Sequence, residues 1–256
     1  MNQNQQFDKH FGNALPPALL ILVFIWIFYW ADSLFLFQFY KLGVLPKSIE
    51  GLQGILFMPL VHSTENFNHI INNSIPIFLL TLFLFYFYKE IAIKVLLFSW
   101  VFTGIGVWLF AANKGAYHIG MSGVIYCLVA FLFTSGTLRK YRPLQALSMF
   151  IAFVYGSMIW GILPFDYLLG SHYVDLSISF EGHFWGAAAG ILLAFWYREQ
   201  GPQRKKYMWQ LEEEMGLEPP DFEGQLRQQE MESAKSQSAQ TKIKYIITKK
   251  SNESKE

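Results

Sequence analysis

Cysteine and net charge are both scarce in this 256-residue sequence, and each shortage excludes a class of protein. Cys127 is the only cysteine, so a disulfide-stapled scaffold is excluded and cysteine usage says nothing of the redox compartment. The formal net charge of +1 argues against a nucleic-acid partner. The sequence contains no His-Glu-x-x-His motif, nucleotide-binding glycine loop or internal repeat. We therefore expect neither a metal ion nor a cofactor.

Charged side chains are also unevenly distributed along the chain. Residues 1–198 carry only 18 of them, whereas residues 199–256 carry 21. Soluble domains have about a quarter of their residues charged, so the first part is not a water-soluble globule. Six apolar stretches in it approach the ~20 residues that cross a bilayer. They cover residues 15–38, 69–88, 92–112, 120–137, 144–163 and 181–197.

The apolar stretches predict an all-α, polytopic membrane protein with a six-transmembrane-helix bundle. Backbone amides in hydrocarbon need internal partners, and the ~10-residue alternating strands of a barrel are not evident. A cleaved signal peptide is the alternative for the first stretch, whose apolar run is long for a signal core. We expect a cytoplasmic segment at 1–14, the six-span domain at 15–198, and a charged, mostly disordered cytoplasmic tail at 199–256.

Two features of that organisation follow from the loops and the tail. Within the tail, residues 207–232 have the pattern of one short amphipathic helix, and a docking site for a partner is the alternative to a solvated tail. If the N-terminus is cytoplasmic, ten Lys and Arg residues fall on inside segments and three on outside loops, as the positive-inside rule requires for both termini inside. The inside set is Lys9, Lys89, Lys94, Arg139, Lys140, Arg142, Arg198, Arg204, Lys205 and Lys206, and the outside set is Lys41, Lys47 and Lys114.

Polar residues gather at the outer ends of three of the predicted spans. A polar or ionisable side chain inside hydrocarbon is costly, so each is a functional candidate. On this topology the three clusters share one membrane depth. They are His69 and Asn73 in the second stretch, Gly120, Ser122 and Gly123 in the fourth, and Glu181 and His183 in the sixth.

Helical spacing aligns the candidates within each span. His69 and Asn73 are four residues apart and therefore share one face, as do Ser122 and Tyr126. In the sixth span, the offsets of three and four residues place a small-residue stripe below the histidine, and such a stripe lets a neighbouring helix approach closely. If that neighbour is the fourth span, with its own small residues, the histidine reaches Ser122. The stripe is His183, Gly186 and Gly190, facing Gly120 and Gly123.

A serine and a histidine in contact are typical of nucleophilic catalysis. A serine hydroxyl needs a base to take its proton, and histidine is the usual base near neutral pH. The side chains of His69 and Asn73 and the free backbone N–H of Ser122 are candidate donors to an oxyanion. Glu181 is two residues from His183 and does not face it on a helix, which favours a dyad over a triad.

Each of these residues also has a simpler explanation when it is taken alone. A serine in a membrane helix usually packs or bonds back to the backbone, a histidine at a helix end is often interfacial, and asparagines can join helices. The glycines can serve packing only. The coincidence of three motifs at one depth favours the catalytic interpretation.

Together the motifs resemble the rhomboid family of intramembrane serine proteases. The matching segments are His69-Ile-Ile-Asn-Asn73, Gly120-Met-Ser122-Gly123 and His183-Phe-Trp-Gly186-Ala-Ala-Ala-Gly190. The resemblance implies that Ser122 is the nucleophile and His183 the general base. It also implies an oxyanion hole and a tyrosine stacked on the catalytic histidine. These would be His69, Asn73 and the Ser122 amide for the hole, and Tyr126 for the stack.

Two departures from the family pattern are visible. Residues 39–61 contain neither the Trp nor the Arg that often form a pair in the family's first outer loop. His62 lies seven residues before His69, where many members have about five, and we assign it no catalytic role.

The resemblance implies an endopeptidase that acts in the lipid bilayer and cleaves single-span membrane-protein substrates near their outer boundary. The short loops favour a bacterial cytoplasmic membrane, with the active site opening to the outer face. A catalytically silent rhomboid-like protein that binds or routes membrane helices is the first alternative. A small transporter or channel is the second, and it would need ionisable residues near the bilayer centre or repeated half-helix breaks. The sequence does not specify an oligomeric state.

Overall fold

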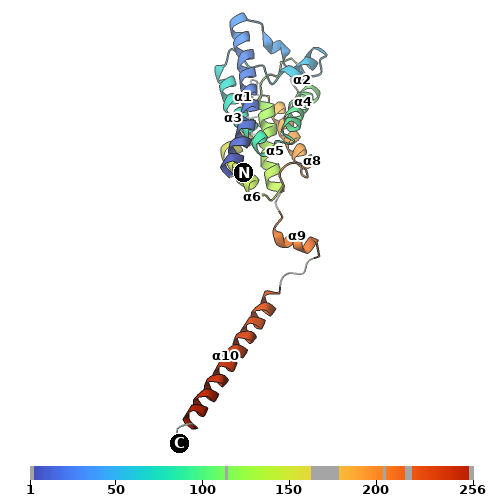
Figure 1. Cartoon of the computed structure of the whole chain (residues 1–256). Helices are drawn as coiled ribbons and strands as arrows, with labels where there is room; N and C mark the ends of the chain where they lie inside the picture. The colour runs from blue at the N-terminus through green and yellow to red at the C-terminus, as the bar shows by residue number, and fades with distance from the viewer. Residues whose placement is uncertain (1–2, 113–114, 163–178, 204–205, 217–220, 254–256) are drawn as a thin grey trace. The chain divides into compact units, whose positions relative to one another are not determined.

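The structure, a computed structural model, describes residues 3–112, 115–162, 179–203, 206–216 and 221–253 (Figure 1). The regular elements among these residues are all helices, which confirms the all-α prediction, and the β-pairing there is one isolated antiparallel bridge, Val44 with His118. The chain divides into two compact units, Met1–Arg204 and Lys205–Glu256, which are described separately.

The first unit contains helices that match the predicted apolar stretches. Four are long and apolar enough to cross a membrane: Phe11–Phe35, Phe67–Phe87, Ala92–Phe110 and Arg142–Gly161. Two further apolar helices, α5 and α8, have 17 residues each, about 25 Å in length. In chain order the elements are α1 (Gln3–Phe35), η1 (Phe39–Leu42), η2 (Glu50–Gln53), α2 (Gly54–Phe57), α3 (Phe67–Phe87), α4 (Ala92–Phe110), α5 (Ser122–Leu138), α6 (Arg142–Tyr155), η3 (Gly156–Gly161) and α8 (Phe180–Trp196).

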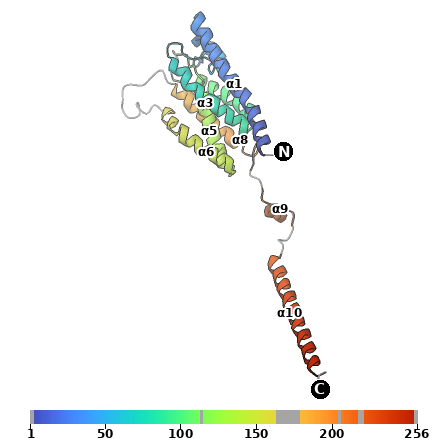
Figure 2. The same ribbon diagram turned by 60° about the vertical axis from the view of Figure 1, so that its left-hand side comes forward.

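Helix α5 occupies the centre of this unit. It packs against α3, α4, α6 and α8, while α1 packs on α3 (Figure 2). Its side chains from Val124 to Leu128 are buried, and Phe131 is fully enclosed. The surrounding helices instead expose many large apolar side chains, such as Phe102 and Phe153. An apolar outer surface around a tightly packed centre is what a bilayer solvent requires.

Close contact between α5 and α8 depends on the glycine stripe of α8. A Cβ atom added at Gly186 would collide with the backbone carbonyl of Gly123, and one added at Gly190 would collide with the carbonyl of Cys127. The two helices therefore touch backbone to backbone, as small-residue stripes in membrane helices allow. This contact sets the height of α8 relative to the start of α5.

Arg139 ties the opposite ends of these two helices together. Its guanidinium donates to Ser135 Oγ (2.9 Å), to the Pro202 carbonyl (3.1 Å) and to the Tyr197 carbonyl, and it lies over the Tyr88 ring. The side chain is almost fully buried. Charge-assisted hydrogen bonds of this kind are stronger than neutral ones, so Arg139 fixes the end of α8 against α5.

The loop between α1 and α3 is held by tryptophans from another helix. Trp100 Nε1 donates to the Leu56 carbonyl, and Trp108 Nε1 donates to the Ser48 carbonyl, each over 2.8 Å. Both tryptophans belong to α4 and lie eight residues apart, hence on one face. The loop, which lacks a Trp-Arg pair of its own, is thus anchored from α4.

Two helix boundaries differ from the sequence-based expectation. Helix α1 begins at Gln3 rather than near residue 15 and contains Pro16 and Pro17. The fifth span ends as an α-helix at Tyr155 and continues as the 3₁₀-helix η3, which starts with a glycine, a poor α-helix former. This change of helix type matters for the site described below.

The second unit contains α9 (Met208–Glu214) and α10 (Phe222–Glu253). Helix α10 covers much of the tail, for which the composition predicts mostly disorder. Its Glu, Gln, Lys and Ala residues have high intrinsic helix propensity, which accounts for the helix. Its described side chains are almost all exposed, so no buried apolar face supports it, and that is why composition points to disorder.

Candidate active site

Ser122 and His183 lie side by side although 61 residues separate them in the sequence. Ser122 is the first residue of α5, and His183 lies in the first turn of α8. The Nε2 atom of His183 is 3.0 Å from Ser122 Oγ, which is hydrogen-bonding distance. The backbone contact at Gly186, one turn further along α8, brings the two side chains this close.

The second ring nitrogen of His183 fixes the direction of that hydrogen bond. Nδ1 is 2.8 Å from the carbonyl oxygen of Gly161. Because a carbonyl can only accept, the hydrogen resides on Nδ1, and the lone pair of Nε2 faces the Ser122 hydroxyl. The histidine is thereby oriented as a base toward the serine, and a backbone carbonyl does the orienting.

Tyr126 stacks on the imidazole of His183. The ring centroids are 4.1 Å apart and the planes differ by 13°. The Tyr126 hydroxyl donates to the Met158 carbonyl over 2.9 Å. Met158 and Gly161 both belong to η3, so this short 3₁₀ segment positions the tyrosine and the histidine together.

The acidic residue nearest to His183 in sequence points elsewhere. Glu181 Oε1 accepts a hydrogen bond from the backbone N–H of Ala112 over 3.1 Å, at the end of α4. Ser179 caps α8 by accepting from the Gly182 amide, and its hydroxyl lies 2.7 Å from Nδ1 of His118. These bonds fix the start of α8, and among the residues that the structure describes no hydrogen bond joins an acidic side chain to the His183 imidazole.

His69 and Asn73 lie against the turn that leads into α5. A Cβ atom added at Gly120 would come within 2.6 Å of His69 Nε2 and 3.8 Å of Asn73 Nδ2. Gly120 also has φ of +109°, which only glycine adopts readily. His69 Nδ1 accepts from the Ser63 amide (3.4 Å), which leaves the hydrogen on Nε2, the atom facing the turn. Both side chains thus present donors two residues before Ser122.

The structure adds one histidine that the sequence analysis left without a role. His62 is buried, its Nδ1 bonds the Leu60 carbonyl (3.3 Å), and its Nε2 receives a long hydrogen bond of 3.5 Å from the Met121 amide. Burial, and next the neighbouring His69, lower the pKa of His62 to about 3. A neutral His62 therefore accepts a hydrogen bond from Met121, the residue before Ser122, and helps to hold it in place. The unusual spacing of seven residues between His62 and His69 was the sequence feature that could have pointed to a role for His62.

Metal ligands do not gather at this site. Within the described ranges, no group of three or more His, Cys, Asp or Glu side chains is arranged to hold a metal ion. The chemistry available to the described residues is that of a hydroxyl, an imidazole and hydrogen-bond donors.

Sequence comparisons place the chain in a family. A model of the Rhomboid domain matches residues 50–200, and the chain belongs to the rhomboid family. An uncharacterised protein of Mycobacterium tuberculosis is 34% identical over 173 residues, which cover 64% of this chain and 65% of that protein. Rhomboid protease GlpG of Yersinia pestis is 35% identical over 98 residues, 38% of this chain and 31% of GlpG. The chain thus spans less than two thirds of the length of these relatives. Its membership of the rhomboid family and its long apolar helices together identify the chain as an integral membrane protein.

Proposed function

We propose that the chain is an intramembrane serine endopeptidase that cleaves single-span membrane proteins with a Ser122–His183 dyad. The observation that carries the proposal is the 3.0 Å contact between Ser122 Oγ and His183 Nε2, with the imidazole turned by its bond to the Gly161 carbonyl. The relationship to rhomboid protease GlpG, a protein named as a protease, supports the same reaction class.

The proposed reaction has two halves. His183 Nε2 takes the proton of Ser122 Oγ as the oxygen attacks the scissile carbonyl, and the resulting oxyanion accepts bonds from His69, Asn73 and the Ser122 amide. The imidazolium gives that proton to the leaving amine as the C–N bond breaks, which leaves an acyl-enzyme. His183 then takes a proton from water, whose oxygen attacks the ester, and returns it to Ser122 as the second product leaves.

The proposed topology has six spans, with both termini cytoplasmic and the dyad near the outer face of a bacterial cytoplasmic membrane. Helices α5 and α8 are short for a span. Helix α5 lies inside the bundle, and α8 packs on α5 and α4 along one side while its other side is exposed. Their first residues then lie below the outer surface, where water can reach the acyl-enzyme. Lys47 and Lys140 should label from opposite sides of the membrane when each is replaced by cysteine in a Cys127→Ser background, and labelling from one side would contradict the topology.

Substrate access is proposed between α3 and α6. The two helices touch through the rings of Phe83 and Phe150, whose centroids are 5.6 Å apart. By analogy with the rhomboid family, we propose residues 164–180 as the cap of this route; they lie mainly outside the described residues. A substrate helix must unwind before its carbonyls are reachable, so Gly, Ala or Pro near the cut favours cleavage.

The direct test is labelling of the purified chain in liposomes with a fluorophosphonate. Wild type and Ser233→Ala, which removes an exposed tail hydroxyl, should label equally, whereas Ser122→Ala and His183→Ala should not label. If folded wild-type protein neither labels nor cleaves any reconstituted single-span protein, the silent binding protein becomes the better description.

A further inference from the structure

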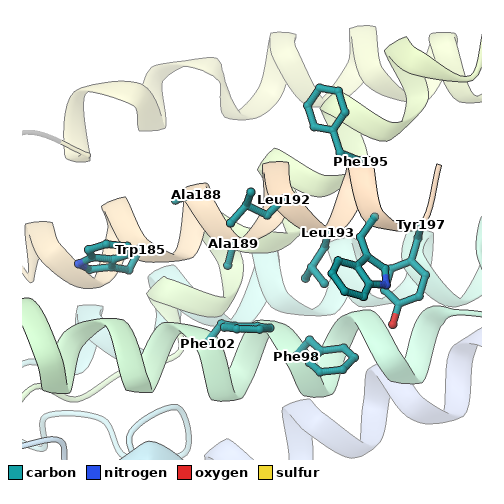
Figure 3. A pocket seen from close by; sticks show the side chains of 10 residues that line it. Phe98, Phe102, Trp185, Ala188, Ala189, Leu192, Leu193, Phe195 and Tyr197 are labelled. Atoms are coloured by element: carbon teal, nitrogen blue, oxygen red, sulfur yellow. The ribbon is translucent and has the colours of Figure 1, made fainter.

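An apolar groove of about 660 Å³ runs between α4 and α8 (Figure 3), and neither Ser122 nor His183 lines it. Figure 3 shows the phenyl rings of α4 lying across from the small and branched side chains of α8. Its walls include Phe98 and Phe102 of α4 and Ala188, Ala189, Leu192 and Leu193 of α8.

The groove opens outward from the bundle. Leu192 is 69% exposed and Trp196 is 79% exposed, whereas the α8 face that carries Gly186 and Gly190 is packed on α5. In an integral membrane protein, an apolar surface at this position is covered by the hydrocarbon of the bilayer. We therefore expect a lipid acyl chain to occupy the groove.

The length of the groove matches one leaflet. One end is closed by Trp185, which stacks on Phe110 with centroids 4.5 Å apart and lies against Gly106. The eleven residue steps from Trp185 to Trp196 rise about 16 Å along α8. Half of the hydrocarbon core of a bilayer is about 15 Å. A single acyl chain from one leaflet thus spans the groove from its open end to the tryptophan.

Basic side chains flank the open end. Lys94 lies one helical turn before Phe98, on the same face of α4, and Arg198 follows Trp196 by two residues. Both are exposed, and Arg198 also pairs with the exposed carboxylate of Glu199 (3.3 Å). Such an exposed pair is weak, so Arg198 remains able to meet another anion.

We propose that this groove binds one anionic phospholipid, with an acyl chain along the groove and the phosphate between Lys94 and Arg198. Apolar walls, a depth of one leaflet and two cations at the headgroup level together fit that ligand. The site is separate from the dyad, so the proposal does not depend on proteolytic activity.

Native mass spectrometry of the full chain in detergent tests the site. With phosphatidylglycerol or phosphatidylcholine of identical chains, we expect one phosphatidylglycerol to be retained in preference. Lys94→Gln and Arg198→Gln should each weaken its binding about five-fold and leave phosphatidylcholine unchanged. Lys47→Gln, an exposed lysine on a different loop, is the matched control and should bind as wild type. Ala188→Trp, which fills the groove, should reduce retention of both lipids.

Two outcomes would overturn the proposal. Equal retention of both lipids, unaltered by the Lys94 and Arg198 variants, would mean that the groove holds only unselected boundary lipid. Displacement of phosphatidylglycerol by excess inorganic phosphate would mean that the cations form a free-phosphate site with no role for the acyl chain.

Discussion

A single methyl group added at Gly186 should disable the proposed dyad while the protein stays folded. The new Cβ would meet the Gly123 carbonyl, which is backbone and cannot rotate away, so α8 must move off α5. Restoring ordinary contact needs a shift of about 1 Å, and His183 lies one turn away on the same face. The distance from Nε2 to Ser122 Oγ, now 3.0 Å, would then exceed hydrogen-bonding range. Displacements of ~1 Å at a reacting pair lower rates about 10²-fold.

The rate of fluorophosphonate labelling measures this effect without a known substrate. Gly186→Ala should label about 10²-fold more slowly than wild type. Gly12→Ala is the matched control and should label as wild type, because apart from the adjoining residues and backbone of its own helix nothing lies within 4 Å of a Cβ at that glycine. Thermal unfolding of both variants in detergent checks that they fold. Wild-type labelling by a folded Gly186→Ala protein would refute the idea that helix contact sets the Ser–His distance.

Three further predictions concern other residues of the first unit. Asn73→Ala should lower the labelling rate about 10²- to 10³-fold through loss of one oxyanion donor, and an unchanged rate would remove Asn73 from that role. Arg139→Met should lower the free energy of unfolding by about 3 kcal/mol in denaturant titration, because charge-assisted bonds to two carbonyls and a hydroxyl are lost; a change near zero would contradict the clamp. His62 has a folded-state pKa of about 3, below its ordinary 6.5, so the unfolded chain takes up a proton first as the pH falls. Stability should therefore decrease from about pH 6.5 downward, by about 2 kcal/mol at pH 5, and His62→Asn should decrease less; equal acid sensitivity of the variant would exclude His62 as the cause.

The sequence predicted the positions of helices that are marked by an apolar run and the faces of helices that are marked by periodic polar residues. Apolar runs set the positions of α3 and α4, predicted at 69–88 and 92–112 and observed at Phe67–Phe87 and Ala92–Phe110. Helical periodicity then placed Ser122 and Tyr126 on one face of their span. The predicted depth and face led us to expect that His183 reaches Ser122 if their two spans are neighbours.

The parts of the site that the sequence did not predict are the contacts made by backbone atoms. The carbonyls of Met158 and Gly161, which hold Tyr126 and His183, leave no trace in residue identity, since any residue offers a carbonyl. Both carbonyls lie near the end of η3, where the last carbonyls of a helix have no intrahelical partner, and apolar runs do not show where a helix ends to within a residue. The anchoring of the first loop was missed for a related reason, because Trp100 and Trp108 read as ordinary span residues until their carbonyl partners are known.

The use of a main-chain carbonyl to orient His183 has a consequence for how this protein tolerates change. No ionised carboxylate has to be kept at membrane depth, where charge is costly. No side-chain replacement can delete the orienting group either. Vulnerability therefore passes largely from residue identity to chain length. Apart from Gly161, where an added Cβ would collide with the Tyr126 hydroxyl, η3 should accept many different side chains. One residue inserted or removed between Gly156 and Gly161 would instead move the carbonyl away from the imidazole and leave the serine without its base.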